Sequence, residues 1–369
     1  MRAPNLTVSP RQARAFLRVR HALGPEFARV ADAVSHLGYV QLDPINVCGR
    51  MHDLILRNRV KGYAEGDLLR HLHGEGSGVR GGFEHYLPGK GILVAFPMEA
   101  WPYVVAFIGA RGGGPHYYGR PLSAAELELA GHIMDRIKVD GSITSDAIEH
   151  EARSETVWGT SGRLAKTVLE ALFASGRVLI SGRTGFRRVY DLPERVIPAS
   201  VLSLPGPGPA ELAGWLVMLK LRQHRLARLR KTDVDALAKS IQPVRVDGGP
   251  PVYCLREDVG ALVSSIDLEP PDDVRLLAPL DPMIYDRELT RRLWDFDYTW
   301  EVYTPKAVRR RGYYALPVLS KGELVGHVEP VADRKSRTLK VVSRRVRRGH
   351  ATAHAVRGLA RFLNLRPPG

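Results

Sequence analysis

The sequence predicts an α+β protein made of several small modules, and three features of the chain support that prediction. With 369 residues and 44% hydrophobic content, the chain is long enough to fill about two to four separate cores. Apolar residues at helical spacing are followed by a β-hairpin pattern in residues 121–200. From residue 274 onward, turns and alternating strand-like runs dominate. We therefore expect helix-and-hairpin modules in tandem, followed by a C-terminal β-rich, barrel-like domain.

Residues 1–120 are predicted to form the first module. Ser9-Pro10 is a favourable helix start, because Ser is a preferred N-cap and Pro suits the first helical position. A second helix follows, and Gly38 ends it as a left-handed C-cap. A short extended segment then leads into a third helix, predicted to begin at Pro44.

Residues 121–200 carry the clearest pattern and are predicted to form the second module. Ser123 caps one helix, a second is expected to begin near Ser145, and residues 162–175 form a third with one apolar stripe. A hairpin that turns at the sequence SGRTG follows. This order is typical of a winged helix, in which the third helix reads a DNA groove and the hairpin is the wing. The compact helices of the first module fit the same plan.

Two further modules complete the predicted organisation. After a linker of sequence LPGPGPAE, residues 201–272 hold two helices and a hairpin pattern, and we expect a third winged-helix-like module there. Residues 273–369 are predicted to form the β-rich domain, with a turn at Lys321-Gly322 and a basic helical tail. The segment 334–369 contains eleven Lys or Arg residues and no acidic residue. It predicts salt-sensitive affinity for phosphates, the alternative being a solvated run of charge.

The net charge of the chain is strongly positive. A formal charge of +15 and an isoelectric point near 10.0 indicate a polyanionic partner, most often nucleic acid. The alternative is a merely basic surface, because a GC-rich genome would also favour Arg over Lys together with frequent Ala, Gly and Pro.

The sequence argues against several other classes. Cys48 and Cys254 are the two cysteines and form no C-x-x-C pair, so neither a disulfide framework nor a cysteine-rich zinc site is expected. The scattered histidines complete no H-E-x-x-H set, and no Walker, Rossmann or G-x-S-x-G pattern is present. We therefore expect neither a metal nor a cofactor. With no signal-peptide pattern and no apolar run of membrane-spanning length, we expect a cytoplasmic protein.

The stretch YVQLD places two hydrogen-bonding side chains on one face of an extended segment. Gln41 and Asp43 alternate with Val40 and Leu42, so their Cα atoms lie about 7 Å apart on the same side. One interpretation is structural: Asp43 before Pro44 is a strong N-cap arrangement. The other is catalytic. The two are compatible, since a helix dipole would keep a capping carboxylate ionised while its second oxygen faces a ligand.

The third helix and the hairpin of the second module carry a cluster of basic side chains. These are Arg163, Lys166, Arg183, Arg187 and Arg188. With Phe186 between the arginines of the hairpin, they suit phosphate contacts together with a groove or base contact. The alternative is an ordinary solvated hairpin tip.

Two blocks of the chain, residues 35–60 and 276–341, resemble the winged-helix DNA glycosylases of the AlkZ/YcaQ type. These are bacterial enzymes that remove alkylated or crosslinked bases. The first block carries the Gln-apolar-Asp triplet, Arg50 and His52. The second carries Asp281-Pro282, Arg287, FDY, RGYY, LPVL and a Val-Gly pair.

The resemblance implies a function for each of these features. It implies that Gln41 and Asp43 are catalytic, and that tandem winged helices form a concave basic surface beside the C-terminal β domain. DNA contacts are then expected from Arg50, His52, Arg309 and Arg310 as well as from the basic cluster of the second module. The sequence departs from relatives at LPGKG after Phe83–Tyr86, where a His followed by small residues is frequent, and at His327, where Arg is expected.

The chemistry of such an enzyme suits the triplet. An N7-alkylated purine is positively charged and leaves readily, so the enzyme must stabilise an oxocarbenium-like sugar and place water at C1′. Asp43 can do the first by charge and accept a proton from the water, while Gln41 holds the water or the sugar-phosphate. No lysine nucleophile is required. We therefore expect a monofunctional, metal-independent hydrolase of duplex DNA carrying N7-alkylated purines, interstrand crosslinks or both.

The competing interpretation is a winged-helix DNA-binding transcriptional regulator without catalysis. A regulator would need no Gln41–Asp43 pair and would usually dimerise over spaced half-sites. Because no heptad or other dimerisation element is evident, we expect a monomer associated with the nucleoid. A third class is an RNA-binding or chromatin-organising protein held by charge alone. Preference for damaged over intact duplex distinguishes the glycosylase from both.

Overall fold

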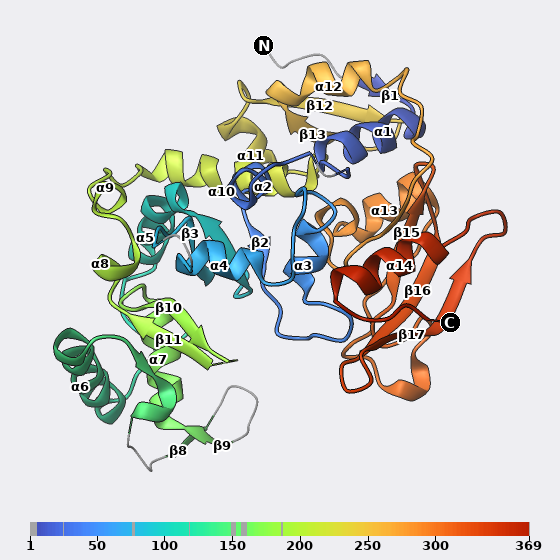
Figure 1. Ribbon diagram of the computed structural model, residues 1–369. Helices are drawn as coiled ribbons and strands as arrows, with labels where there is room; N and C mark the ends of the chain where they lie inside the picture. Colours follow the sequence, from blue (N-terminus) through green and yellow to red (C-terminus); the bar gives the residue numbers. More distant parts are fainter. Residues whose placement is uncertain are drawn as a thin grey trace. The chain divides into compact units, whose positions relative to one another are not determined.

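The computed structural model describes residues 6–24, 26–75, 78–117, 119–148, 153–155, 161–185 and 187–368. The chain forms two compact units. Unit 1 comprises Met1–Leu68 together with Ala213–Gly369, and unit 2 comprises Leu69–Leu212. Unit 1 is therefore assembled from both ends of the chain (Figure 1). The four module boundaries expected from the sequence remain a prediction.

The first two helices of unit 1 begin and end as their sequences predict. Helix α1 (Pro10–Arg20) is capped by Ser9, whose hydroxyl accepts a 3.1 Å hydrogen bond from the Gln12 N–H. Helix α2 (Val30–Leu37) ends at Gly38, which has a φ of +79°. Local capping chemistry sets both boundaries.

The third helix is predicted to begin at Pro44, but this prediction is wrong. The helix begins seven residues later, as α3 (Met51–Leu56). Two short-range hydrogen bonds organise the intervening chain. Asp43 accepts from the Ile45 N–H at 2.9 Å, and Asn46 Oδ1 accepts from the Gly49 N–H at 3.1 Å. Such side-chain bonds offer the backbone an alternative to the helical pattern, which explains the later start.

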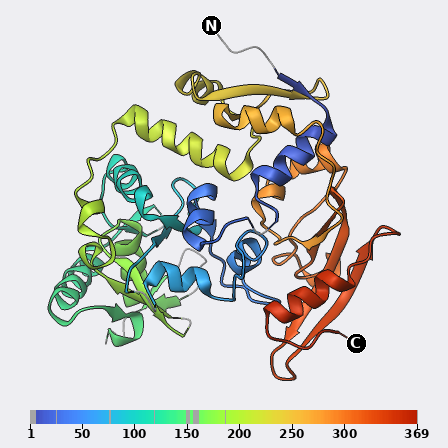
Figure 2. The same cartoon turned by 45° about the horizontal axis from the view of Figure 1, so that its top comes forward.

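A three-stranded sheet joins the N-terminus of unit 1 to a distant segment. Strand β1 (Leu6–Val8) pairs in parallel with β12 (Ile241–Val246), which pairs antiparallel with β13 (Val252–Leu255). Its surroundings include α10 (Pro209–His224), α11 (Lys231–Ala236), η3 (Arg256–Asp258) and α12 (Val259–Ser264). Helix α1 packs against α12 and α13 (Arg287–Trp294), and Phe16, Leu17, Val244 and Leu262 belong to their common core (Figure 2).

The C-terminal part of unit 1 is a four-stranded antiparallel sheet in the order β14-β15-β16-β17. Its elements are β14 (Val274–Leu276), η4 (Pro282–Ile284), η5 (Lys306–Val308), β15 (Leu316–Ser320), β16 (Glu323–Asp333), β17 (Thr338–Val346) and α14 (Ala353–Phe362). The β15–β16 turn lies at Lys321-Gly322, and the tail is helical, both as predicted. The expectation of a C-terminal β-rich domain is confirmed, without a closed barrel among the described strands. The described strands form an open sheet, and α14 packs against its short edge strand β14.

Unit 2 contains two of the three helices and the hairpin predicted for the winged helix of residues 121–200. Helix α6 (Ala124–Asp140) starts with a Ser123–Glu126 capping box, and α7 (Leu164–Ala174) precedes the hairpin of β10 (Leu179–Thr184) and β11 (Arg187–Asp191). Strand β7 (Ile143–Thr144) adds a third strand beside β11. The helix expected near Ser145 is a single 3₁₀ turn, η2 (Ser145–Ala147), and residues 149–152 lie outside the described part.

The remaining elements of unit 2 surround this module. Strands β3 (Gly82–Tyr86) and β4 (Leu93–Pro97) form a second hairpin, followed by η1 (Met98–Ala100) and α5 (Trp101–Ala110). The others are β5 (His116–Tyr117), β6 (Arg120–Pro121), β8 (Arg153–Glu155), β9 (Ser161–Arg163), α8 (Pro193–Val196) and α9 (Ala199–Leu202). The two boundaries between the units fall within α4 (Asp67–His73) and α10. The fold is thus a mixed α+β fold, as predicted.

Candidate functional site

The YVQLD stretch of unit 1 has the alternation that its sequence predicts. Strand β2 (Val40–Gln41) begins it, and Val40 and Leu42 are buried. Gln41 and Asp43 are partly exposed. Both polar groups therefore remain accessible above an apolar floor.

Asp43 does not cap a helix, so the capping interpretation is wrong for this residue. Its carboxylate closes a local turn with Ile45, and no helix follows directly. The expected support from a helix dipole is therefore missing. Burial raises the pKa of Asp43, and the hydrogen bond from the Ile45 N–H only partly offsets this effect. The group is a partly desolvated carboxylate.

The second Asp-Pro pair of the chain does have the structural role. Asp281 accepts a 3.1 Å hydrogen bond from the Met283 N–H at the start of η4. Its two oxygens also bind the Arg59 guanidinium, and both side chains are completely buried. Identical dipeptides thus serve different purposes in one unit.

Aromatic side chains stand beside Asp43. Burial and, in smaller part, the charge of Asp43 raise the pKa of Tyr303, while burial, Cys48 and then Asp43 raise the pKa of Tyr314. Asp43 is therefore within electrostatic range of both phenols. Tyr314 is fully buried, whereas Tyr303 is 82% exposed. The Trp300 ring contacts both tyrosine rings edge-on, with centroids 6.1 Å from Tyr303 and 5.8 Å from Tyr314. We call residues 300–314 the aromatic strap.

Two buried carboxylates fix the aromatic strap. Glu301 accepts hydrogen bonds from the backbone N–H groups of Arg310, Arg311 and Gly312, and Glu329 accepts one from Tyr313 at 2.7 Å. Gly312 has a φ of +125°, and a Cβ there would lie 2.2 Å from Glu329 Oε2. The strap is therefore a constrained segment.

Two of the predicted DNA contacts, Arg309 and Arg310, lie on this strap. Arg309 Nε donates to the Thr304 carbonyl at 2.7 Å, and its guanidinium carbon lies 4.8 Å from the centre of the Tyr313 ring. Arg310 is exposed. The structure thus brings Asp43, Tyr303 and both arginines into one region of unit 1.

Gln41 borders a small cavity in unit 1. Tyr285 and Gln223 also line it. The Gln223 side-chain amide donates to the carbonyls of Leu37 and Tyr39 at 2.6 and 2.7 Å, which fixes the chain entering β2. Sequence reasoning assigned no site role to Gln223, Tyr285 or Tyr303. The RGYY run of the second block was the available signal for the strap.

The other two contacts expected in unit 1 differ in accessibility. Arg50 directly precedes α3 and is partly exposed. His52 is only 3% exposed, and its Nε2 lies 3.7 Å from Asp53 Oδ2. Burial is incompatible with a direct DNA contact in this conformation, so the expectation for His52 is corrected.

The basic cluster of unit 2 divides into internal and surface groups. Arg183 pairs with the buried Glu84, and Arg188 pairs with Glu170 at 2.8 Å. Arg163 and Arg187 both bind Asp146, at 3.2 and 2.7 Å, and each remains 67% exposed. Lys166 is exposed, and Phe186 lies outside the described residues. Three of the five basic groups therefore remain available to phosphates.

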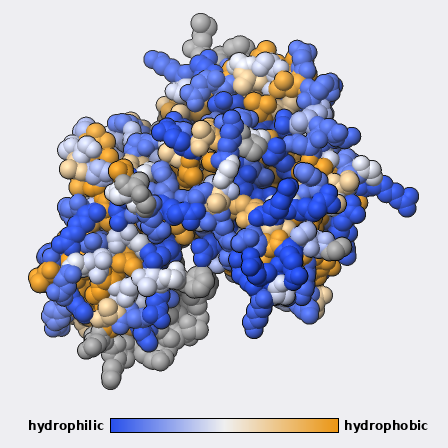
Figure 3. Space-filling view, in the orientation of Figure 1, coloured by the Kyte–Doolittle hydropathy of each residue, from blue (hydrophilic) through white to orange (hydrophobic). Residues whose placement is uncertain are grey.

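The basic run near the C-terminus is a surface feature. Arg344, Arg345, Arg347 and Arg348 are all exposed along β17 and the chain after it. Figure 3 shows hydrophilic side chains projecting in this region of unit 1. Such a surface would attract a polyanion.

The described part of the chain contains no candidate metal site, disulfide or membrane-spanning helix. No group of three or more His, Cys, Asp or Glu side chains there could hold a metal ion. Cys48 and Cys254 are buried free thiols. None of the described helices combines the length and apolar character needed to cross a membrane.

Comparison with known proteins supplies the context for this site. A sequence model for the family described as "DNA glycosylase AlkZ-like" matches residues 34–363. Among solved structures, the DNA glycosylase AlkZ of Streptomyces sahachiroi superposes with a TM-score of 0.61. That match covers 98% of this chain and 99% of the other, at 18% sequence identity, and it shows a common fold.

Proposed function

Because the chain belongs to the AlkZ-like DNA glycosylase family, we propose that it hydrolyses the N-glycosidic bond of N7-alkylated purines in duplex DNA, including purines joined in interstrand crosslinks. Asp43 and Gln41 are the proposed catalytic residues. The observation that carries this proposal is the state of Asp43. It is a partly desolvated, accessible carboxylate that has no capping role and stands beside an aromatic strap.

The proposed reaction needs one negative charge and one water molecule. Alkylation at N7 makes the purine cationic, so the C1′–N9 bond breaks with its electron pair going to the base. The sugar left behind is oxocarbenium-like, and the Asp43 carboxylate stabilises it. Water then adds to C1′ and gives a proton to Asp43. A raised pKa suits a general base, because it makes the carboxylate a better proton acceptor.

Gln41 is proposed to position the water or the sugar-phosphate. It stands two residues from Asp43 on the same exposed face, so its amide can donate one hydrogen bond and accept another beside the reacting carbon. The mechanism involves no lysine adduct. The products are therefore the free base and an intact abasic strand, the mark of a monofunctional enzyme, and none of the proposed steps uses a metal ion.

The surrounding basic and aromatic groups are proposed to hold the DNA. Arg50, Arg309 and Arg310 would bind phosphates near Asp43, and Arg163, Lys166 and Arg187 would do so in unit 2. Exposed Tyr303 would stack against a base next to the lesion. We propose a monomer that acts on chromosomal DNA at the nucleoid.

Base release from defined lesions tests the proposal. Purified protein would be incubated with duplexes carrying N7-methylguanine or a nitrogen-mustard interstrand crosslink, and abasic sites revealed with alkali. Asp43→Asn is expected to slow release by about a hundredfold or more while leaving DNA affinity nearly unchanged. Asp272→Asn removes an exposed carboxylate elsewhere in unit 1 and serves as the matched control.

Two outcomes would contradict this assignment. Equal losses of binding and release in Asp43→Asn would make the residue structural. Failure of the wild-type protein to release either base, together with tight binding to intact duplex, would favour a DNA-binding regulator.

A further inference from the structure

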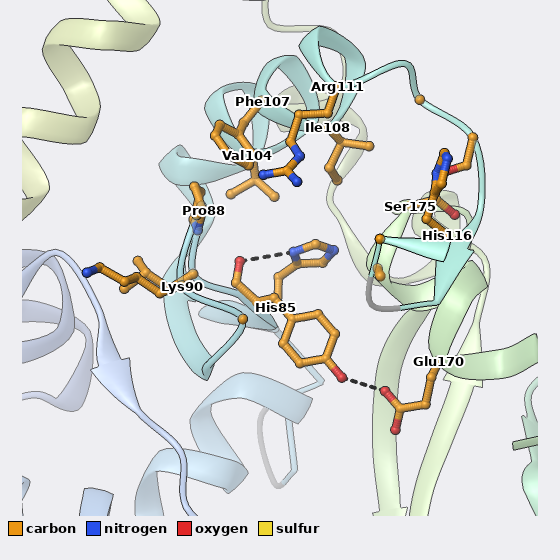
Figure 4. Close-up of a pocket in the computed structure, with 18 residues that line it drawn as sticks. His85, Pro88, Lys90, Val104, Phe107, Ile108, Arg111, His116, Glu170 and Ser175 are labelled. Carbon is orange, nitrogen blue, oxygen red and sulfur yellow. Dashed lines mark hydrogen bonds between the residues drawn. The ribbon is translucent and has the colours of Figure 1, made fainter. Parts of the chain in front are cut away.

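Unit 2 contains a cavity of about 460 Å³ that lies outside the site described above. The turn between β3 and β4, helix α5, the loop that follows α5 and the end of α7 form its walls (Figure 4). A volume of this order accommodates a small organic molecule. All the lining residues belong to unit 2, so the cavity is complete within that unit.

One wall of the cavity is apolar. Val104, Phe107 and Ile108 of α5 line it together, and Figure 4 shows them on the same side of the space. Beneath them lies His85, whose ring nitrogens interact with the carbonyls of Phe173, at 2.9 Å, and Tyr86, at 3.3 Å. Burial lowers the pKa of His85, which disfavours a positive charge on this ring. These surfaces suit the flat faces of an aromatic ring.

The cavity also carries an unbalanced positive charge. Figure 4 shows the Arg111 guanidinium pointing into the space, with Lys90 at the rim. The Phe107 ring supports Arg111, whose guanidinium carbon lies 5.7 Å from the ring centre. Among the described residues no ion pair engages Lys90 or Arg111. An anion bound here would therefore meet a cation that is not already paired with a carboxylate.

One carboxylate, that of Glu170, lines the cavity, and it already has two hydrogen-bond partners. Glu170 accepts hydrogen bonds from the Tyr86 hydroxyl at 2.5 Å and from Arg188 at 2.8 Å. It therefore cannot neutralise Arg111 without abandoning two partners. The guanidinium has the planar geometry that binds two oxygens of a phosphate at once.

Hydrogen-bond acceptors complete the lining. In the tautomer whose Nδ1 donates to the Gly114 carbonyl at 2.8 Å, the Nε2 of His116 is an acceptor. Ser175 Oγ donates to the Ala171 carbonyl at 2.9 Å and retains lone pairs. Acceptors of this kind recognise the N–H edge of a nucleobase.

From this combination we infer that the cavity binds a nucleoside 5′-phosphate, with the phosphate on Arg111 and the base against α5. The ligand could be a free mononucleotide or a nucleotide displaced from a DNA strand, because both carry the same chemistry. The inference does not rest on the proposed glycosylase activity, since it uses no residue of the Asp43 site.

Calorimetric titration of the full-length protein with dGMP, deoxyguanosine and inorganic phosphate tests the inference. We expect dGMP to bind more tightly than either fragment. Arg111→Gln should weaken dGMP binding by about tenfold or more. Ala174→Met, which places extra atoms in the cavity, should weaken it as well. Arg136→Gln, an exposed arginine on α6, is the matched control and should bind as the wild type does.

A competition experiment, in which DNA duplexes are added to the protein with bound dGMP, distinguishes the two sources of the ligand. Loss of bound dGMP to a duplex with an unpaired extrahelical nucleotide, but not to a fully paired duplex, supports a strand nucleotide. Retention of dGMP against both supports a free mononucleotide. Three results would overturn the inference: no dGMP binding, phosphate binding as tightly as dGMP, or wild-type affinity in both Arg111→Gln and Ala174→Met. Repeating the titration with Asp43→Asn should give wild-type affinity whether or not base release occurs.

Discussion

Arg59 binds the carboxylate of Asp281 through two hydrogen bonds, 2.9 and 2.7 Å long, and no part of either side chain reaches solvent. A buried pair of this kind tolerates the loss of one partner poorly, because the other charge is left without compensation. Asp43, which shares the Asp-Pro context, has no such ion-pair partner among the described residues. Substitution should therefore destabilise the protein much more at Asp281 than at Asp43.

Asp281→Ala is expected to lower the free energy of unfolding by about 3–5 kcal/mol, since it leaves Arg59 as an unpaired buried cation. Asp43→Ala should change it by less than about 1 kcal/mol, because only one local hydrogen bond is lost. Urea denaturation followed by circular dichroism measures both. Comparable losses in the two variants would show that Asp43 is also structural.

The decrease in the rate of base release at low pH should follow the protonation of Asp43. Its pKa is raised above the ordinary value of 3.8, so the carboxylate becomes protonated at a higher pH than an exposed aspartate. The rate should fall as pH drops through that raised pKa. The effect on stability has the opposite sign. Because the pKa of Asp43 is raised in the folded state, this group stabilises the fold below pH 3.8, and that contribution is lost as the pH rises through the pKa of the folded state. Single-turnover rates from pH 4 to 8 test the first point, in steps of about 0.5. A flat profile would exclude Asp43 as the base.

Tyr303 should contribute through its ring rather than its hydroxyl. The side chain is 82% exposed at the edge of the aromatic strap, where it can stack on a base. Tyr303→Ala is expected to weaken lesion-DNA binding by about 5- to 100-fold, whereas Tyr303→Phe should remain close to wild type. Fluorescence of 2-aminopurine beside the lesion follows the stacking directly. An equal effect of both variants would assign the role to the hydroxyl instead.

Gly312→Ala should displace the aromatic strap. The new Cβ would lie 2.2 Å from Glu329 Oε2 in a backbone conformation that L residues rarely adopt. We expect a loss of base release of about tenfold or more, with little change in circular dichroism. Gly62→Ala is the matched control, because Gly62 has a φ of +66° and a Cβ there would meet nothing within 4 Å. Wild-type activity in Gly312→Ala would mean that the strap position is unimportant.

Predictions that depended on neighbouring residues were confirmed most often. The Ser9 cap, the end of α2 at Gly38 and the α6 cap at Ser123 involve bonds over three residues or fewer, and their signals are contained in the sequence. Asp43 and Asp281 show the limit of this approach. Their local sequences are alike, and what separates them is Arg59, which lies 222 residues from Asp281.

The candidate site was predicted in part for the same reason. The alternation of Gln41 and Asp43 followed from the period of a strand. The aromatic strap joins the site through long-range packing, and the internal roles of Arg183 and Arg188 depend on Glu84 and Glu170. Sequence spacing contains no information on such pairings. The sequence therefore predicts DNA contacts from all three arginines of the hairpin alike.

The pairing of β1 with β12 has a consequence for the order of events on the ribosome. Strand β1 ends at Val8, and its partner begins at Ile241, so the first strand emerges long before the segment it must join. At roughly 5–20 residues per second, the delay is about 12 to 47 seconds. All of unit 2 is synthesised during that interval and can complete its own core. Strand β1 is thus among the last elements to reach its native place, and until β12 emerges its backbone groups have no strand partner.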